Sequence, residues 1–368
     1  MRVLLVSPYD LSHSGGVTSH VFDVAHALDR MGHEVAIAGP ASGGPLPQNG
    51  YTHHLGSTFR LISPGDGARI NLNPLVIRPV RELLASRKFD VVHLHEPFLP
   101  FIGPAFLHFA DAIKVGTFHT WREGPHIPYI SGLPFVRYWN RLLQGRIAVS
   151  EAARRTVMTY VPGDYEIIPN GVDFERFAGA NGGPPVYEGG RPTILFVGRI
   201  ESRKGIPYLL TAFQTIKERR PDARLVIVGD GGLRPEYEAL SHRLGLRDVH
   251  FEGYVEPALL PGYFKHADVF CSPSTVNESF GITLLEAMAA GTPVVATSVN
   301  GPGTLGEDGV TGLIVPARDA AALAEALLRL LDDRPYAARL AEAAQTRARR
   351  FDWSEVARQL LAYYESLA

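Results

Sequence analysis

MRVLLVSPYDLSHSGGVTSHVFDVAHALDRMG, residues 1–32, joins a short apolar run to an amphipathic helix. Residues 3–6 form a continuous apolar run of the kind found in buried strands. After a loop, apolar residues recur at helical spacing on one face and stop before Gly32: Val17, Val21, Val24, Ala25, Leu28 and Met31. This order of strand, loop and helix predicts the first unit of a doubly wound α/β sheet.

The same alternation continues through both halves of the chain. Because helical patterns separate these runs, we expect parallel sheets. Breaker-rich segments at 179–185 and 188–192 divide the runs into two sets, which predicts two Rossmann-like domains with a central cleft. Two helices are expected over 332–368. The predicted strands are 3–6, 34–38, 91–94, 115–119, 147–149, 194–197, 225–228, 249–251, 269–271 and 294–296.

Composition limits the classes of function. With 368 residues, 45% of them hydrophobic, the chain is long enough for two cores. Its 36 basic and 38 acidic residues give a net charge of -2, which argues against binding nucleic acid by bulk charge. A single cysteine, Cys271, excludes an intrachain disulfide. Without an evident signal peptide or membrane span, we expect a cytoplasmic protein, with peripheral membrane contact left open.

Ligands of open α/β sheets bind beyond the carboxyl ends of the strands. Gly15 and Gly16 directly precede the first helix, so backbone amides there can approach a phosphate closely. In the second half, the loop 198–205 holds Arg199, Arg203 and Lys204, and cations of these types suit a diphosphate. No Asp-x-Asp pair occurs in the sequence, so we expect protein cations, and no metal, to neutralise that charge.

A second loop-to-helix junction carries two carboxylates eight residues apart, in ESFGITLLE at residues 278–286. Glu278 precedes the predicted helix and Glu286 is expected about two turns into it. The first amides of a helix can receive an anion. The simpler alternative, two solvent-facing acids, is disfavoured because the helix is otherwise almost uncharged and its flanks are apolar.

Histidines follow two of the predicted strands. His93 and His95 are two residues apart and should share a face, but no third metal ligand is evident, so structural roles are favoured. His119, at the end of an apolar strand, is the better candidate to contact a substrate. The glycine string at 229–232 lacks the third glycine of a dinucleotide site, and the string at 301–306 is not followed by the long helix of such a site. A nicotinamide enzyme is therefore disfavoured.

These motifs together resemble the retaining, nucleotide-sugar-dependent glycosyltransferases of family 4, which have the two-domain fold called GT-B. The likeness covers nearly the whole chain. Within the family, the sequence is most similar to bacterial phosphatidylinositol α-mannosyltransferases. The motifs shared with the family are Gly15-Gly16-Val17, Gly198-Arg199, Lys204-Gly205, Pro169-Asn170-Gly171-Val172-Asp173 and 278–286, and those shared with the subgroup are His95-Glu96-Pro97, Thr117-Phe118-His119-Thr120, 146–150 and Asp352-Trp353-Ser354.

The resemblance implies roles for individual residues on the donor side. Arg199 and Lys204 would neutralise the donor diphosphate, Glu278 would bind the transferred sugar, and His119 would contact it near the reacting carbon; these four are the implied catalytic residues. Gly16 would lie against the diphosphate and Glu286 would hold the ribose. The implied nucleotide-sugar site also includes Gly253, Tyr254 and Val255 near the base, with Ser279, Phe280, Gly281 and Ile282 at the helix start.

The resemblance is weaker on the acceptor side. Tyr9 and Thr120 match positions that contact inositol phosphate in the mannosyltransferase subgroup. Thr18, Phe98 and Gly124 stand where that subgroup has Gln, Asn and Lys, and Arg122 could replace the lost lysine. Aromatic residues over 98–109 could meet a lipid, although helical spacing favours the core. The helix with Arg78, Arg81, Arg87 and Lys88 is modestly basic.

The resemblance also implies the domain organisation and the reaction. Residues 1–166 would form the acceptor-side domain, completed by a C-terminal helix, 351–368, that crosses back to it, and 167–350 would bind the nucleotide sugar. We expect a metal-independent, retaining transfer of a hexose, with mannose from GDP-mannose favoured, to a lipid headgroup such as phosphatidylinositol. The alternatives are a family 4 enzyme that uses a UDP- or ADP-sugar and a soluble polyol or sugar-phosphate acceptor, or a nucleotide-sugar epimerase. A cytoplasmic monomer without nucleic-acid partners is expected, with contact at the inner face of the cell membrane left open.

Overall fold

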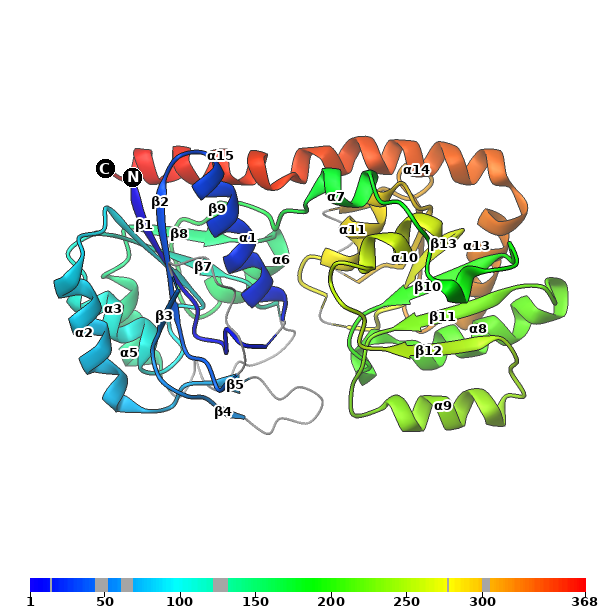
Figure 1. Ribbon diagram of the computed structural model, residues 1–368, viewed down its shortest axis with the longest axis horizontal. Helices are drawn as coiled ribbons and strands as arrows, with labels where there is room; N and C mark the ends of the chain where they lie inside the picture. Colours follow the sequence, from blue (N-terminus) through cyan, green and yellow to red (C-terminus); the bar gives the residue numbers. More distant parts are fainter. Residues whose placement is uncertain (14, 44–51, 61–68, 122–131, 277, 300–304) are drawn as a thin grey trace. The chain divides into compact units, whose positions relative to one another are not determined.

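The computed structural model describes residues 1–13, 15–43, 52–60, 69–121, 132–276, 278–299 and 305–368. The chain forms two compact units: Met1–Gly171 with Trp353–Ala368, and Val172–Asp352. The units therefore divide after Gly171 and Asp352, slightly later than the boundaries of 166 and 350 expected from the sequence. Each unit is a mainly parallel sheet with helices on both faces (Figure 1).

The N-terminal unit has a seven-stranded parallel sheet in the order β3-β2-β1-β6-β7-β8-β9. A separate antiparallel pair, β4 and β5, lies outside it. The strands are β1 (Arg2–Val6), β2 (Glu34–Gly39), β3 (Thr52–His54), β4 (Phe59–Arg60), β5 (Arg69–Ile70), β6 (Val91–His95), β7 (Ile113–Phe118), β8 (Gly145–Ala148) and β9 (Glu166–Ile167).

Alternation along the strands divides the core of this unit in two. Leu4 and Val6 face one hydrophobic cluster, and Val3 and Leu5 face the other. Helix α15 packs against α1 on the second face, so the C-terminal helix belongs to the N-terminal unit, as the family resemblance implied (Figure 1). The helices are α1 (Gly16–Arg30), η1 (Pro74–Val76), α2 (Ile77–Ser86), α3 (Ile102–Phe109), α5 (Leu133–Asn140), α6 (Glu151–Met158) and α15 (Trp353–Ser366).

The C-terminal unit has a six-stranded parallel sheet in the order β12-β11-β10-β13-β14-β15. Helices α8, α9 and α13 pack on one face, and α7, α10 and α11 on the other. The strands are β10 (Thr193–Val197), β11 (Arg224–Val228), β12 (Val249–Gly253), β13 (Val269–Ser272), β14 (Val294–Thr297) and β15 (Leu313–Val315). The helices are α7 (Phe174–Ala178), η2 (Pro185–Tyr187), η3 (Ser202–Lys204), α8 (Ile206–Arg219), α9 (Arg234–Arg243), α10 (Leu260–His266), α11 (Ile282–Ala290), α13 (Ala320–Asp332), α14 (Arg334–Ala348) and η4 (Arg349–Phe351).

Every strand expected from the sequence is present, and both sheets are parallel. The strands that the sequence did not predict are short: β3, β4, β5, β9 and β15 have two or three residues each. Such runs are too short to show the two-residue period of a strand. Within the described parts of the chain, every helix is too short or too polar to cross a membrane.

Candidate active site

The loop after β10 holds two arginines around one buried carboxylate. The Nε atoms of Arg199 and Arg203 lie 2.8 and 2.9 Å from the two carboxylate oxygens of Glu201, whose side chain is 8% exposed. A carboxylate shared in this way restricts both guanidinium groups. More than half of the Arg199 side chain is exposed. The sequence did not single out Glu201, because a lone acid in a basic loop carries no pattern.

A glycine brings this loop against the segment that follows β13. Gly205 has φ +72°, and a Cβ atom there would lie 1.9 Å from the carbonyl oxygen of Pro273. The close approach places Lys204 beside Glu278, with Nζ 2.6 Å from Oε2. The hydroxyl of Ser274 donates to the same oxygen at 3.0 Å. Lys204 and Glu278, predicted separately from two distant motifs, therefore meet in a single site.

Glu278 is charged in this environment. Burial of its side chain would raise its pKa, but the positive charge and hydrogen bond of Lys204 outweigh burial, with Arg203 at 3.9 Å and Ser274 acting in the same direction. The net result is a pKa below the usual value for glutamate. Glu278 is thus an ionised acceptor of hydrogen bonds, held in one orientation and suited to the hydroxyls of a sugar.

Helix α11 starts at the second predicted motif. Gly281, with φ +91°, precedes the helix and has no side chain to cap the first amides of α11. Phe280 is 2% exposed and its ring lies 6.0 Å from that of Phe351, so it anchors the junction in the core. Glu286 is partly exposed and lies just over one turn after Ile282, not the two turns expected from the sequence. Ser279 and Ile282 are also partly buried at this junction.

Glycines pack three loops of the C-terminal unit together at the carboxyl edge of its sheet. A Cβ atom on Gly229 would lie 2.0 Å from the carbonyl oxygen of Gly198, and the amide of Gly229 donates to the carbonyl of Gly253 at 2.8 Å. The loop carrying Arg199 is therefore joined, through Gly229, to the predicted base site after β12. There, Tyr254 is 60% exposed and Val255 is partly buried.

The N-terminal unit carries the remaining predicted residues. Gly16 is the exposed first residue of α1, and its N-cap, Gly15, has no side chain that could cap the first amides of the helix. Thr18 is buried in the first turn. Tyr9 is partly buried and bridges to Ile70 in an antiparallel pair.

Next to Tyr9 lies a buried carboxylate that the sequence did not identify. Asp10 accepts hydrogen bonds from the hydroxyls of Ser12, Ser42 and Thr58 at 2.5 to 2.6 Å. Burial would raise the pKa of Asp10, but these hydrogen bonds more than offset it and hold that pKa well below its usual value. Asp10 thus ties the loop after β1 to two segments far along the chain. No regular spacing in the sequence relates Asp10 to these partners, so no motif reveals the contact.

Glu96 organises the end of β7. Its Oε1 atom accepts from the amide of His119 at 2.8 Å, and from the amide and hydroxyl of Thr120 at 3.0 and 2.9 Å. Glu96 is 4% exposed and has φ +47°, an uncommon conformation for a residue other than glycine. It thereby fixes the backbone of two predicted site residues. In the sequence, Glu96 stood out only as part of the His-Glu-Pro motif.

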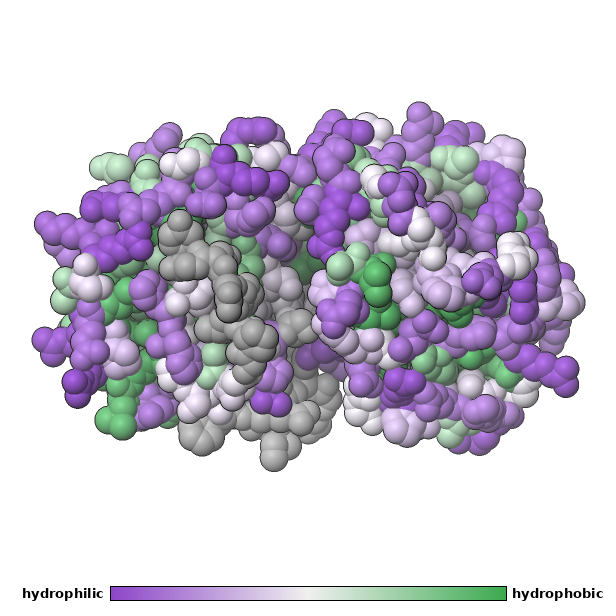
Figure 2. Space-filling model, viewed as in Figure 1, coloured by the Kyte–Doolittle hydropathy of each residue, from purple (hydrophilic) through white to green (hydrophobic). Residues whose placement is uncertain are grey.

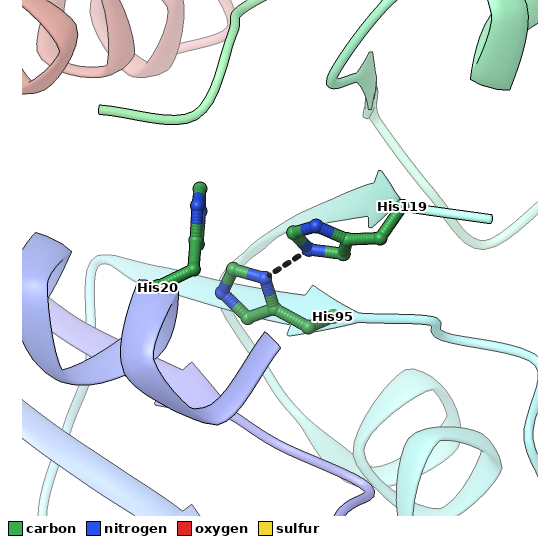
Figure 3. A group of neighbouring side chains, drawn as sticks. All are labelled: His20, His95 and His119. Carbon is green, nitrogen blue, oxygen red and sulfur yellow. Dashed lines mark hydrogen bonds between the residues drawn. The ribbon is translucent and has the colours of Figure 1, made fainter. Parts of the chain in front are cut away.

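His119 is joined by two buried histidines, His20 from α1 and His95 from β6 (Figure 3). Nδ1 of His95 lies 2.9 Å from Nε2 of His119, and the ring of His20 meets both edge-on at 5.1 and 4.9 Å. Burial lowers the pKa of His20 to about 4 and that of His95 and His119 well below the usual value, so the rings are neutral near pH 7.

The sequence showed no third histidine for a metal site, whereas the structure supplies His20. The candidate ligand atoms of the three rings lie within 4.8 Å of one another. However, His95 and His119 each already use one nitrogen in their mutual hydrogen bond. A divalent cation would also place two positive charges in a buried site. The contacts seen among the three rings are those of a network of neutral side chains.

The remaining acceptor-side positions are Phe98, Arg122 and Gly124. Phe98 is 4% exposed and packs in the core, with its ring 5.5 Å from that of Phe118. The structure thus places it with the other core aromatics and not on the surface. Arg122 and Gly124 lie outside the described residues.

Comparison with known proteins places these features in a family. Residues 14–176 match the family described as "Glycosyltransferase Family 4", and residues 185–347 match "Glycosyl transferases group 1". A phosphatidyl-myo-inositol mannosyltransferase of Mycobacterium leprae is 38% identical over 100% of this chain and 97% of its own length. One of Propionibacterium freudenreichii is 32% identical over 99% and 94%. A glycosyltransferase structure from Rickettsia africae shares the fold, with a TM-score of 0.81 at 23% identity, covering 100% of this chain and 98% of that one.

Proposed function

The chain belongs to the family 4 glycosyltransferases of group 1, and we propose that it transfers mannose from GDP-mannose to a hydroxyl of the inositol ring of phosphatidylinositol. The observation that carries this proposal is the 38% identity to phosphatidyl-myo-inositol mannosyltransferase over the whole chain. An epimerase is disfavoured, because the relatives named above are transferases.

We propose a role in the reaction for individual residues of both motifs and of the N-terminal unit. In the transfer, the bond between C1 of mannose and the diphosphate breaks, and a new bond forms between C1 and the acceptor oxygen, whose proton passes to the departing GDP or to solvent. Arg199 and Lys204 would stabilise the negative charge that grows on the departing GDP. Glu278 would bind the sugar, Glu286 the ribose and His119 the sugar near C1. Gly16 and the open start of α1 would approach the diphosphate.

Donor choice can be tested without knowing the acceptor. GDP, UDP and ADP, and their sugars, would be compared by thermal shift, because a ligand that binds only the folded state raises the unfolding temperature. We expect GDP-mannose to give the largest shift. A larger shift with a UDP- or ADP-sugar would favour the alternative donor, and transfer to a free polyol or sugar phosphate without vesicles would favour the alternative acceptor.

Transfer is proposed to need no divalent metal, because protein cations would neutralise the diphosphate. We therefore expect the transfer rate to be unchanged by EDTA and by subsequent addition of Mg²⁺ or Mn²⁺. The measurement is the initial rate of mannose transfer at saturating donor. A rate that falls with EDTA and returns with Mg²⁺ would show that a metal takes part.

We also propose that the enzyme acts as a monomer at the cytoplasmic face of the membrane, which it contacts through one surface of the N-terminal unit. We call this the α2 surface and define it by five residues: Leu75, Ile77, Arg78, Arg81 and Phe109. Leu75, Ile77 and Phe109 are 75%, 40% and 38% exposed, and Arg81 lies over the Phe109 ring. In Figure 2, hydrophobic side chains appear near the start of α2 among hydrophilic ones. Exposed apolar groups beside arginines suit an anionic lipid surface.

Replacing Leu75 and Ile77 by serine is expected to weaken binding to phosphatidylinositol vesicles about tenfold or more, because about 1.5–3 kcal/mol is gained by burying one such side chain. Co-sedimentation with vesicles measures the effect. The matched control is Leu259→Ser, which removes a leucine that is 62% exposed on the C-terminal unit. Equal binding of the double variant and the control would rule out the α2 surface, and light scattering would check for a monomer.

A further inference from the structure

Helix α15 fixes a buried histidine in the sheet of the N-terminal unit. His93, on β6, is bonded at both ring nitrogens: Nδ1 to the hydroxyl of Tyr364 at 2.6 Å, and Nε2 to the hydroxyl of Thr117 at 2.6 Å. His93 and Tyr364 are fully buried. A ring with a partner at each nitrogen cannot rotate without losing a buried hydrogen bond. Tyr364 of α15 therefore sets the plane of His93.

His95 lies between His93 and His119. Its ring stacks on that of His93, with centroids 4.6 Å apart and an interplanar angle of 25°. It also stacks on the ring of His119, with centroids 5.2 Å apart and an interplanar angle of 30°. Its Nδ1 makes the 2.9 Å contact with Nε2 of His119 that Figure 3 draws. The order Tyr364, His93, His95 and His119 thus connects the C-terminal helix to the residue at the end of β7. The ring of Trp353, the first residue of α15, also meets the ring of His20 edge-on, with centroids 5.1 Å apart.

The other nitrogen of His95 indicates the direction of its hydrogen bond. Nε2 of His95 is buried and has no hydrogen-bond partner among the described residues. A buried N–H without an acceptor is less tolerated than an acceptor without a donor. The proton of neutral His95 therefore lies on Nδ1 and is donated to Nε2 of His119. Since a neutral imidazole carries one proton, His119 must carry its own on Nδ1.

We propose that His95 is a positioning residue for His119, fixing its ring orientation and its Nδ1–H tautomer, and that Tyr364 on α15 sets His95 through His93. The effect on turnover rests on the proposed function, in which His119 contacts the transferred sugar. A residue at the reacting centre needs partners that hold its rotamer and its proton. Here the most distant partner comes from the last helix of the chain.

The test combines side-chain ¹⁵N NMR of His119 with kinetics. Wild type is expected to show His119 protonated at Nδ1. His95→Ala should change that signal and lower kcat roughly 10–100-fold with little change in KM, as loss of an outer-shell partner does. His95→Asn, whose amide can donate from near the Nδ1 position, should restore most of the wild-type His119 signal and most of kcat. Tyr364→Phe should shift the His119 signals and lower kcat by a smaller factor.

The matched control is Tyr363→Phe, the same change one residue earlier on α15. The hydroxyl of Tyr363 accepts from the amide of Arg146 at 2.9 Å and does not belong to the histidine cluster. We expect normal His119 signals and normal kcat. An Nε2–H tautomer in wild type, or unchanged His119 signals in both His95→Ala and Tyr364→Phe with an intact fold, would overturn the positioning role. Shifted signals in an enzyme that transfers no mannose would support positioning and refute the proposed function.

Discussion

Replacing Glu278 by glutamine is expected to lower kcat for mannose transfer roughly 10²-fold or more, while the affinity for GDP stays unchanged or rises. The substitution keeps the shape of the side chain but removes the charge that is proposed to accept hydrogen bonds from sugar hydroxyls. It also removes the anion 2.6 Å from Lys204, whose charge then acts fully on a diphosphate. Initial rates and calorimetric titration with GDP measure the two effects.

The control for this variant is Glu325→Gln in the same unit. Glu325 is a largely exposed carboxylate paired with Arg219 at 3.2 Å, so its loss should change neither turnover nor GDP affinity. Near-normal kcat in Glu278→Gln would remove Glu278 from the site. A large loss of GDP affinity would instead indicate that this carboxylate supports the structure of the nucleotide site.

Replacing Lys204 by alanine is expected to lower both kcat and GDP affinity, with a kcat loss of about 10²–10³-fold. The cation that would neutralise the leaving diphosphate is gone. Buried Glu278 also loses its nearest partner, which destabilises the fold by up to about 3–5 kcal/mol, reduced to the extent that Arg203 compensates. Turnover, calorimetry with GDP and thermal unfolding measure the three effects.

A second lysine in the same unit separates catalysis from stability. Lys217 pairs with Asp248 at 2.8 Å, and both side chains are partly buried. Lys217→Ala should therefore lower the unfolding temperature while kcat and GDP affinity remain normal. If the two alanine variants lost turnover in parallel, the effect of Lys204 would be structural. The opposite changes in GDP affinity expected for Glu278→Gln and Lys204→Ala distinguish the roles of the two partners.

The fold was largely predictable because its strands are long enough to show a pattern. Runs such as 3–6 and 194–197 are buried on both faces of parallel sheets, so they are continuously apolar. The short β9 and β15 carry no such signal. The packing of α15 on α1 could not be predicted from composition, because the apolar face of a helix does not identify the element that it packs against. Only the family resemblance implied it.

The candidate site was predictable where one motif carries the chemistry. Lys204 and Glu278 were identified from separate loops, but their contact spans 74 residues and depends on the backbone approach at Gly205. His20 was missed because it occupies a buried position on an ordinary amphipathic helix. Likewise, Asp10 and Glu96 act by accepting hydrogen bonds from segments that only the fold brings together. Supporting residues of this kind leave little trace in a single sequence.

Product analysis with radiolabelled GDP-mannose and phosphatidylinositol vesicles tests the central claim most directly. The sugar of GDP-mannose is an α-glycoside, so a retaining transfer predicts label in the lipid fraction as an α-linked mannosyl phosphatidylinositol, identified by NMR of the purified product. The label in the lipid fraction should fall roughly 10²-fold or more with the Glu278→Gln variant over the same time. Label that remains in water-soluble products, or appears as an altered nucleotide sugar without any acceptor, would contradict the account.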